Sequence, residues 1–449
     1  MRFLRYFIVF SILIFLYSCS TNVKIQTPYL ESYKQSVLND DFWKFFNNKE
    51  LLDILEKALN NNLDLKIQRY KLQKSIVDLR VQKSSAFKDI SLNLGASRNA
   101  AKNSNRDISY SNSYTLNIST QYEIDMWGRI KSGVDAASFG VVGLKEAYKT
   151  IALTVASNAA SLWLNIVACK EKLDLLKEKE KLALMVIKLN KEIYKNGGNN
   201  FDALINSKKS YKSIKESIAA CKKNLETNKH RLSLIIGIYD SNMDIKTYKM
   251  PIYKPICRKI PVEILKKRPD VENAYYSLLS KYANLKQKKA EMFPKLVLSP
   301  DITYSSSKLN SMFDNWILKL AVNVFYPVID YKRRALDVKK AKLQIKESLE
   351  SYKKTLLNAT VEAQDTLSQC KELNTKLKLR TKKIKLQSIA LKRAQKGFLE
   401  GEKSLIETLN NKMDLIDKKI DLIDTNKDLL INKIDIYRVC GGKYLGKRL

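Results

Sequence analysis

The sequence contains two copies of one pattern of about 200 residues. Asp64 and Phe87 recur as Asp270 and Phe293, at an offset of 206 positions. At an offset of 204, five more residues recur: Tyr122, Arg129, Ala137, Gly197 and Gly237 correspond to Tyr326, Arg333, Ala341, Gly401 and Gly441. Matches that hold nearly one register to the C-terminus indicate a tandem duplication, with a join around residues 239–259.

Each copy predicts the same order of elements. Apolar residues at i, i+3, i+4 and i+7 from Leu51 predict an amphipathic helix that continues to about Ala86, with a counterpart at 269–292. Two segments of strict alternation follow in each copy, as in strands. They cover residues 89–97, 114–124, 296–305 and 316–324, and the polar stretches 99–112 and 306–314 separate them as the loops of hairpins.

Two very long helices follow the strands. Only 8 Pro and 13 Gly occur in 449 residues, so long elements can run without interruption. Residues 130–196 and 333–399 predict helices about 100 Å long. Each breaks at glycine, at Gly197-Gly198 or Gly401, and a second helix returns to Gly237 or Gly441. Helices of this length are typical of coiled coils or tubes rather than of a globular domain.

The strands place apolar residues on one face and Ser, Thr, Asn or Gln on the other. Aromatic residues lie near their ends: Tyr114, Tyr122, Trp127, Tyr304, Trp316 and Tyr326. This pattern is typical of transmembrane β-strands, although a soluble, half-exposed sheet has the same alternation. Four strands cannot close a barrel, and hydrocarbon tolerates no open sheet edge. A membrane sheet therefore predicts an oligomer. The side chains of a barrel of about eight strands, from a dimer, nearly fill its interior, whereas a barrel of about twelve strands, from a trimer, leaves a lumen.

The N-terminus predicts export from the cytosol. Arg2 and Arg5 precede an apolar run at 6–17, which is too short to span a bilayer and is typical of a signal peptide. Cys19 follows Ser18, and this arrangement resembles a bacterial lipoprotein signal in which the cysteine is acylated. Ser20 favours the outer membrane by the same resemblance. The alternative is ordinary secretion with Cys19 removed or unmodified.

Charge and rare residues limit the remaining function classes. The net charge of +35 first suggests nucleic acid, and residues 376–385 hold six basic side chains. Export favours a solvated helix face instead, so we expect no nucleic-acid partner. One histidine, His230, leaves no histidine metal cluster and little catalytic chemistry. The cysteines that remain after Cys19 are scattered, with no C-x-x-C, and do not predict a disulfide framework.

Several motifs together resemble the TolC-like outer-membrane efflux channels, in particular their OprM- and NodT-like lipoprotein branch. They are Phe42-Trp43-x-x-Phe46, the stretch Tyr122-Glu123-Ile124-Asp125-Met126-Trp127-Gly128-Arg129, Arg268-Pro269-Asp270-Val271 with Phe293-Pro294, and Tyr437-x-x-x-Gly441-Gly442. The resemblance implies a mixed α/β membrane protein. It is a homotrimer whose chains each contribute four strands to a shared transmembrane β-barrel, continued by a long α-helical periplasmic barrel.

The same resemblance implies a passive exit duct, with no enzymatic activity. Such a duct docks on a periplasmic adaptor protein and an inner-membrane transporter, and it expels drugs or other small molecules from the cell. Its barrel is surrounded by outer-membrane lipid. The alternative within the family is the outer-membrane component of a type I protein or peptide secretion system. Outside the family, a structural coiled-coil surface protein and a basic nucleic-acid-binding protein remain open.

The resemblance also divides the chain and assigns its sites. The segments are a signal peptide (1–18), an N-terminal anchor and equatorial segment (19–48), a first repeat (49–238; hairpin 89–125, helices 130–237), a linker (239–262), a second repeat (263–442; hairpin 295–329, helices 333–440) and a tail (443–449).

We expect the adaptor to dock at the helix reversals, Gly197, Gly198 and Gly401. The expected periplasmic aperture contains Ile406, Asn410 and Met413, with Asn206 as the repeat counterpart of Asn410. Related channels carry Asp and Arg where this chain has Asn410 and Met413, so we expect a ring of amides. No cofactor or metal is expected beyond a covalent lipid on Cys19.

Overall fold

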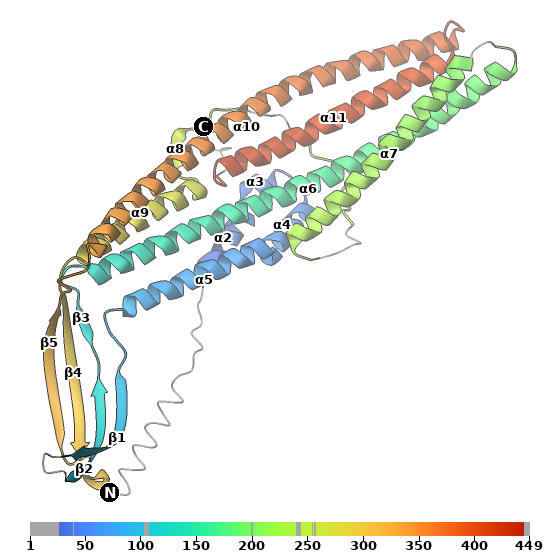
Figure 1. The fold of residues 1–449 in the computed structure, drawn as a ribbon. Helices are drawn as coiled ribbons and strands as arrows, with labels where there is room; N and C mark the ends of the chain where they lie inside the picture. The colour runs from blue at the N-terminus through green and yellow to red at the C-terminus, as the bar shows by residue number, and fades with distance from the viewer. Residues whose placement is uncertain are drawn as a thin grey trace.

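The computed structural model describes residues 27–38, 40–102, 107–198, 201–238, 244–253, 255 and 257–443. Figure 1 shows an elongated molecule in which a β-sheet forms one end and long helices run away from it. The mixed α/β fold class is therefore confirmed. The signal peptide and Cys19 lie outside the described residues.

The elements follow the duplicated order. The N-terminal segment and first repeat form α2 (Pro28–Leu38), α3 (Asp41–Lys44), α4 (Lys49–Asn61), α5 (Leu63–Ser84), β1 (Ser91–Lys102), β2 (Ile108–Ser119), β3 (Tyr122–Ile124), α6 (Arg129–Lys195) and α7 (Phe201–Ile236). The second repeat forms α8 (Val262–Lys266), α9 (Pro269–Ala290), β4 (Lys295–Ser306), the 3-10 turn η1 (Leu309–Ser311), β5 (Trp316–Phe325), α10 (Arg333–Leu399) and α11 (Leu405–Val439).

The two longest helices, α6 and α10, have 67 residues each and begin at equivalent repeat positions. The first amphipathic helix, in contrast, is not continuous as the sequence predicted. It breaks at Asn62, whose backbone is extended and whose side-chain oxygen accepts a hydrogen bond from the Leu65 N–H. Asparagine is a favoured N-cap because its amide satisfies an otherwise unpaired helix N–H, and it starts α5 as a separate helix.

The sheet is antiparallel throughout its length. β1 pairs with β2, β2 pairs with β4, and β4 pairs with β5. β3 continues the line of β2 along β4, so the four predicted strands are present with one of them interrupted. The first hairpin is longer than predicted, since the pairing of β1 with β2 continues as far as the pair Lys102 and Ile108. Most of the polar stretch expected as a loop is therefore strand.

The helices form a curved layer with two flanks. α6 contacts α5, α7, α9 and α11, whereas α10 contacts α9 and α11. α5 and α7 therefore form one flank of the layer and α10 forms the other. α6 contains an 18-residue segment of mean hydropathy 1.5, and 67% of that segment is buried inside the protein, as expected of a central helix.

The main hydrophobic core lies about half-way between the sheet and the far tips of the helices, where α2, α3 and α4 pack on α6 and α11. Phe42 stacks on Tyr437 with ring centroids 4.1 Å apart, and the Tyr437 hydroxyl donates a hydrogen bond to Asp40 at 3.0 Å. Trp43 and Trp163 are fully buried in the same cluster. These contacts attach the N-terminal segment to the end of the second repeat.

The two repeats use equivalent contacts where the end of the helix that returns from the tips, α7 or α11, meets the start of the helix that leads to the sheet, α5 or α9. The Asn62 amide donates a hydrogen bond to the Ile235 carbonyl, and Arg268 donates one to the Val439 carbonyl 204 positions later. Gly237 and Gly441 end these helices with φ of +74° and +68°. A Cβ on Gly237 would lie 2.5 Å from the Asn61 carbonyl oxygen. Glycine supplies both the left-handed backbone and the close approach.

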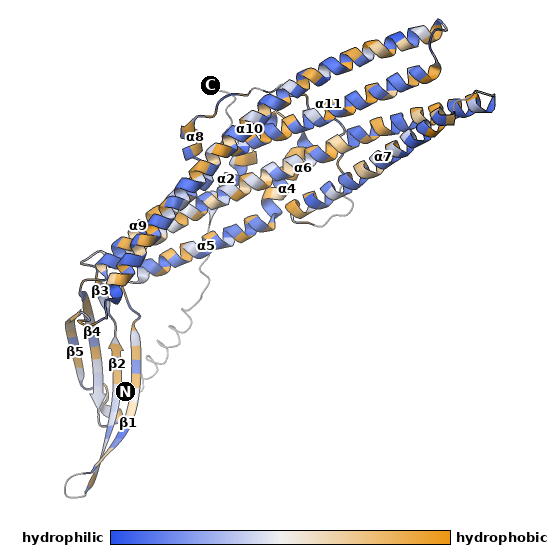
Figure 2. Cartoon of the chain, turned by 45° about the horizontal axis from the view of Figure 1, so that its top comes forward, coloured by the Kyte–Doolittle hydropathy of each residue, from blue (hydrophilic) through white to orange (hydrophobic). Residues whose placement is uncertain are grey.

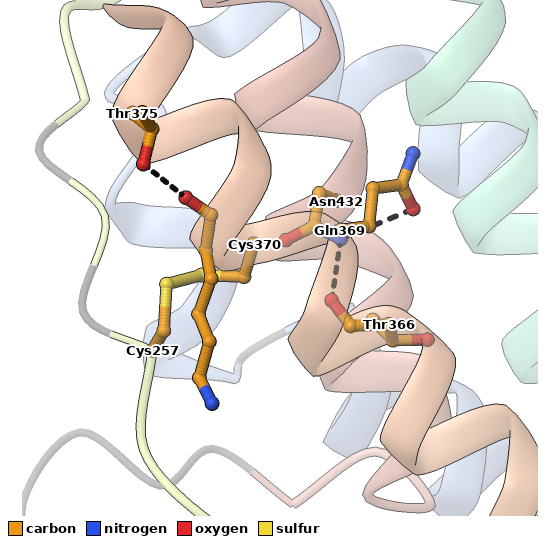
Figure 3. The surroundings of a disulfide bond; sticks show 7 residues. Cys257, Thr366, Gln369, Cys370, Thr375 and Asn432 are labelled. Carbon is orange, nitrogen blue, oxygen red and sulfur yellow. Dashed lines mark hydrogen bonds between the residues drawn. A yellow bond between two sulfur atoms is a disulfide. The ribbon is translucent and has the colours of Figure 1, made fainter. Parts of the chain in front are cut away.

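A disulfide joins the inter-repeat linker to α10, which the scattered cysteines did not predict. Cys257 bonds to Cys370 across 113 residues of sequence, with Cα atoms 5.8 Å apart (Figure 3). Cys370 is buried, and the Asn432 amide on α11 donates a hydrogen bond to the nearby Thr366 carbonyl at 3.0 Å. The bond fixes the otherwise irregular linker against the helical layer.

Replacing Cys257 or Cys370 with serine should destabilise the protein by about 2–4 kcal/mol, because the bond closes a long loop of the unfolded chain. Thermal unfolding in detergent, with and without reductant, measures the effect. Cys440→Ser serves as control, since Cys440 is a free buried thiol, and its unfolding should still respond to reductant as the wild type does. Alkylation of Cys257 in unreduced protein would contradict the bond.

Candidate functional site: a channel wall

The sheet has one apolar and one polar face, and within the described residues no helix packs on either. Its apolar face exposes large side chains of β1, β2 and β5, including Leu94, Tyr110 and Leu320, whereas the apolar side chains of β4 are half-buried. On the polar face, the Asn117 amide donates hydrogen bonds to Thr303, at 2.9 Å, and to Asp301. A polar hollow of about 520 Å³ on this face is lined by Asp301, Lys319 and their neighbours. Figure 2 shows the mixed hydropathy of the strands.

Aromatic residues gather at both ends of the sheet. At the end next to the helices, Trp127 stacks on Phe293 with centroids 4.7 Å apart, and Phe87 packs on Tyr122 at 4.7 Å. At the far end Tyr304 pairs with Trp316 across the strands and packs against Phe313. Two aromatic belts around an apolar band are typical of a membrane-spanning sheet.

Both edges of the sheet are open. Within the described residues, β1 pairs with β2 alone and β5 pairs with β4 alone. Each outer strand therefore presents unpaired backbone N–H and C=O groups along 12 residues of β1 and 10 residues of β5. The sheet is complete only if another strand pairs at each edge.

The two flanks of the helical layer carry exposed apolar stripes. On α5 the exposed residues recur at intervals of three, four and seven: Leu63, Ile67, Tyr70, Val77 and Val81. On α10 the exposed leucines include two series at intervals of seven or fourteen: Leu336, Leu343 and Leu357, then Leu379 and Leu386. Heptad spacing of apolar residues is typical of a helix face that packs against another helix.

The helix reversals at the far tips use glycine for two reasons. Gly197 and Gly401 have φ of +83° and +76°, and nothing lies within 4 Å of a Cβ built on either. Gly198 is constrained by space instead, because its Cβ would lie 2.8 Å from the Ile193 carbonyl oxygen. Glycine is therefore required at both reversals, for backbone conformation at Gly197 and Gly401 and for space at Gly198.

The four expected aperture residues lie together. Ile406, Asn410 and Met413 from α11 and Asn206 from α7 line one cavity of about 580 Å³, which α6 closes with Asn190. Asn206 and Asn410 are exposed, whereas Met413 is buried among the apolar side chains of α6 and α7. The polar part of the lining is therefore amide and hydroxyl, with no charged side chain among the described residues that form it.

A second hollow, of about 510 Å³, adjoins the first and shares Ser210 with it. It contains Cys169 and Cys221, and the Cys221 thiol lies within hydrogen-bond distance of the Cys169 carbonyl. The sequence did not predict this pair, since the two cysteines are 52 residues apart. They meet only because α6 and α7 run antiparallel, which the predicted helical hairpin could have indicated.

Comparison with known proteins decides the family. The sequence model for outer membrane efflux proteins matches residues 54–238 and again residues 260–442. The chain belongs to the outer membrane efflux protein family. The double match confirms the tandem duplication, and the membership confirms both the resemblance to TolC-like channels and the outer-membrane location.

Curated relatives and solved structures agree with this membership. The chain is 24% identical over 310 residues to the probable outer membrane lipoprotein SilC of Salmonella typhimurium, covering 67% of this chain and 65% of SilC. It is 23% identical to the cation efflux system protein CusC of Escherichia coli K12, covering 63% and 64%. The chain thus spans just under two thirds of these relatives. The Campylobacter jejuni CmeC outer membrane channel has the same fold, with a TM-score of 0.78, 21% identity and coverage of 89% and 87%. Of these relatives, CusC is named for cation efflux and CmeC is named as a channel.

A buried lysine lies among aromatic rings next to the main hydrophobic core. The Lys433 ammonium lies 4.4 Å from the ring centroid of Tyr253 and also faces Phe45 and Phe42. No carboxylate among the described residues pairs with it. Burial lowers the pKa of Lys433 to about 7, because a low-dielectric environment penalises the charged form.

This lysine should make stability depend on pH. Between about pH 7 and the unfolded pKa of about 10.4, the unfolded chain binds more protons than the folded one, so stability should rise with pH. Below about pH 7 the penalty is complete and constant. Lys433→Met should raise the unfolding temperature at pH 7 and flatten the slope up to pH 10, measured by thermal unfolding in detergent.

Lys427→Met is the matched control, since Lys427 lies on the same helix and pairs with Asp428 at 3.2 Å. It should leave the pH slope unchanged. Equal slopes in wild type and Lys433→Met would contradict the assignment.

Proposed function

We propose that the protein is the outer-membrane exit duct of a tripartite efflux system, acting as a passive homotrimeric channel. One observation carries the proposal: a four-stranded sheet with an apolar face, two aromatic belts and two open edges. An unpaired edge in hydrocarbon costs several kcal/mol per group, so β1 of one copy must pair with β5 of the next. Three copies make a barrel of about twelve strands, which is wide enough for a lumen.

The helical flanks support the same closure. When β1 meets β5 of a neighbour, α5 continues from β1 and α10 continues from β5, so their exposed stripes are brought side by side. This contact is heterologous, because different surfaces meet, and such contacts close into rings. The helices then form a tube that extends the barrel into the periplasm.

Cross-linking tests the closure. Asn93 and Asn323 lie on the polar face of β1 and β5, each two residues from the helix-proximal end of its strand. The double variant Asn93→Cys/Asn323→Cys, treated with a short bifunctional maleimide, should give covalent species that stop at the trimer on denaturing gels. Each single variant is the control and should give no ladder. A ladder that stops at the dimer, or continues past the trimer, would refute the proposed closure.

We further propose that Asn410 and Asn206 form a ring of amides at the periplasmic aperture. Amides close by hydrogen bonds and carry no charge, so the aperture should not respond to divalent cations as a carboxylate ring would. The location of both residues in one polar cavity near the tips supports this assignment.

Single-channel conductance in lipid bilayers tests the aperture. Asn410→Asp should introduce block by Mg²⁺ or Ca²⁺ that is relieved at acidic pH, since a carboxylate ring binds hard cations when ionised. Asn426→Asp, farther along α11, is the control and should conduct as the wild type does. Identical cation responses of wild type and Asn410→Asp would remove Asn410 from the constriction.

The remaining assignments follow from the same architecture. The tips at Gly197, Gly198 and Gly401 are the docking surface for a periplasmic adaptor, which connects the duct to an inner-membrane transporter. An acyl chain on Cys19 anchors the N-terminus in outer-membrane lipid, and the name of SilC as a lipoprotein supports this. The duct needs no cofactor and catalyses no reaction. Its cargo is selected by the transporter, and CusC is named for cation efflux.

A further inference from the structure

The hollow that contains Cys169 and Cys221 has the composition of a ligand site rather than of a packing defect. Cys169 on α6 and Cys221 on α7 are free thiols, and the Cys221 thiol also donates a hydrogen bond to the Cys169 carbonyl at 3.3 Å. Both line an opening of about 510 Å³, together with hydroxyls such as Ser213 and Ser217. Two sulfur ligands are therefore held together beside accessible space.

The number and type of these ligands select the metal. Within the part of the chain that the structure describes, no three His, Cys, Asp or Glu side chains group as a metal site. Zinc needs four ligands and Ca²⁺ or Mg²⁺ needs six or more oxygens, so none of them is held here. Soft thiolates prefer Cu(I) and related monovalent d10 ions, which are satisfied by two sulfurs.

The surrounding charges suit a bis-thiolate complex. Two thiolates and one monovalent cation carry a net charge of −1, which nearby cations can stabilise. Lys172 and Lys179 line the same hollow, and each also pairs with a carboxylate of α11, Asp424 at 2.9 Å and Asp417 at 2.6 Å. Each of these carboxylates is engaged by a lysine, and within the described residues none of them joins the two thiols in a group of three metal-ligating side chains.

We propose that Cys169 and Cys221 form a two-coordinate site for a soft monovalent cation, Cu⁺ or Ag⁺, in the wall of the helical layer. On binding, two sulfur–metal bonds form and the thiol protons leave to solvent, with no change of oxidation state. The site is independent of the duct proposal, because it depends on contacts within one chain.

Silver titration of the detergent-solubilised full chain tests the site. One equivalent of Ag⁺ per chain should protect Cys169 and Cys221 together from maleimide, as read by peptide mass spectrometry, and one equivalent of Zn²⁺ should not. Cys169→Ser and Cys221→Ser should each weaken Ag⁺ binding by about 100-fold or more, since a chelate becomes a single ligand. Cys440→Ser, which removes a free buried thiol elsewhere, should bind Ag⁺ as the wild type does.

Three results would overturn the proposal. One is unchanged Ag⁺ affinity in Cys169→Ser; another is alkylation of both thiols in the presence of bound Ag⁺. The third is a Cys169–Cys221 disulfide in protein purified without reductant. The protection experiment uses the wild type, so it decides the matter even if a serine variant fails to fold. Trimer cross-linking at Asn93 and Asn323 is unaffected by any of these results.

Discussion

Backbone hydrogen bonding at the sheet edges is the constraint on which the rest of the molecule depends. A membrane supplies no water to satisfy the N–H and C=O groups of β1 and β5, so the chain cannot place its sheet in hydrocarbon alone. The exposed stripes on α5 and α10 lie on the same two flanks as the open edges. One chain is thus a segment of a ring in both its sheet and its helical layer.

The periodic features of this architecture could be predicted from the sequence, whereas contacts between distant segments could not. The alternation of β1–β5 and the uninterrupted helices α6 and α10 depend on local spacing, which a sequence displays directly. The break at Asn62 was missed because it falls inside a continuous helical pattern, where a single cap residue outweighs the spacing. Cys257 pairs with Cys370 only through the packing of the linker on α10, which no sequence interval encodes. The contact of Cys169 with Cys221 follows from the antiparallel hairpin of α6 and α7, which the sequence does predict, although it does not give the register of the two helices.

The repeats retain geometry more strictly than chemistry. Asn62 and Arg268 fulfil one role, because each donates a hydrogen bond to a carbonyl at the end of α7 or α11. The donor is a neutral amide in one copy and a guanidinium in the other. The guanidinium requires more partners, and Arg268 forms ion pairs with Asp270 and Glu362, both at 2.8 Å. A buried charge is tolerated only when it is paired in this way. The residue before α6 and α10 differs similarly, since this left-handed position is Gly128 in one copy and Lys332 in the other.

Position in the layer also accounts for much of the basic charge. α6 and α10 have equal length, yet α10 carries 18 basic and 6 acidic residues, a net +12, whereas α6 carries 12 and 7, a net +5. α6 packs against α4, α5, α7, α9 and α11 and presents apolar surface on more of its sides, so fewer of its positions can hold a solvated ammonium. α10 lies on a flank, and most of its lysines are exposed. The charge is therefore concentrated where burial permits it, along the flank of the helical layer, and its distribution follows from packing without requiring a nucleic-acid partner.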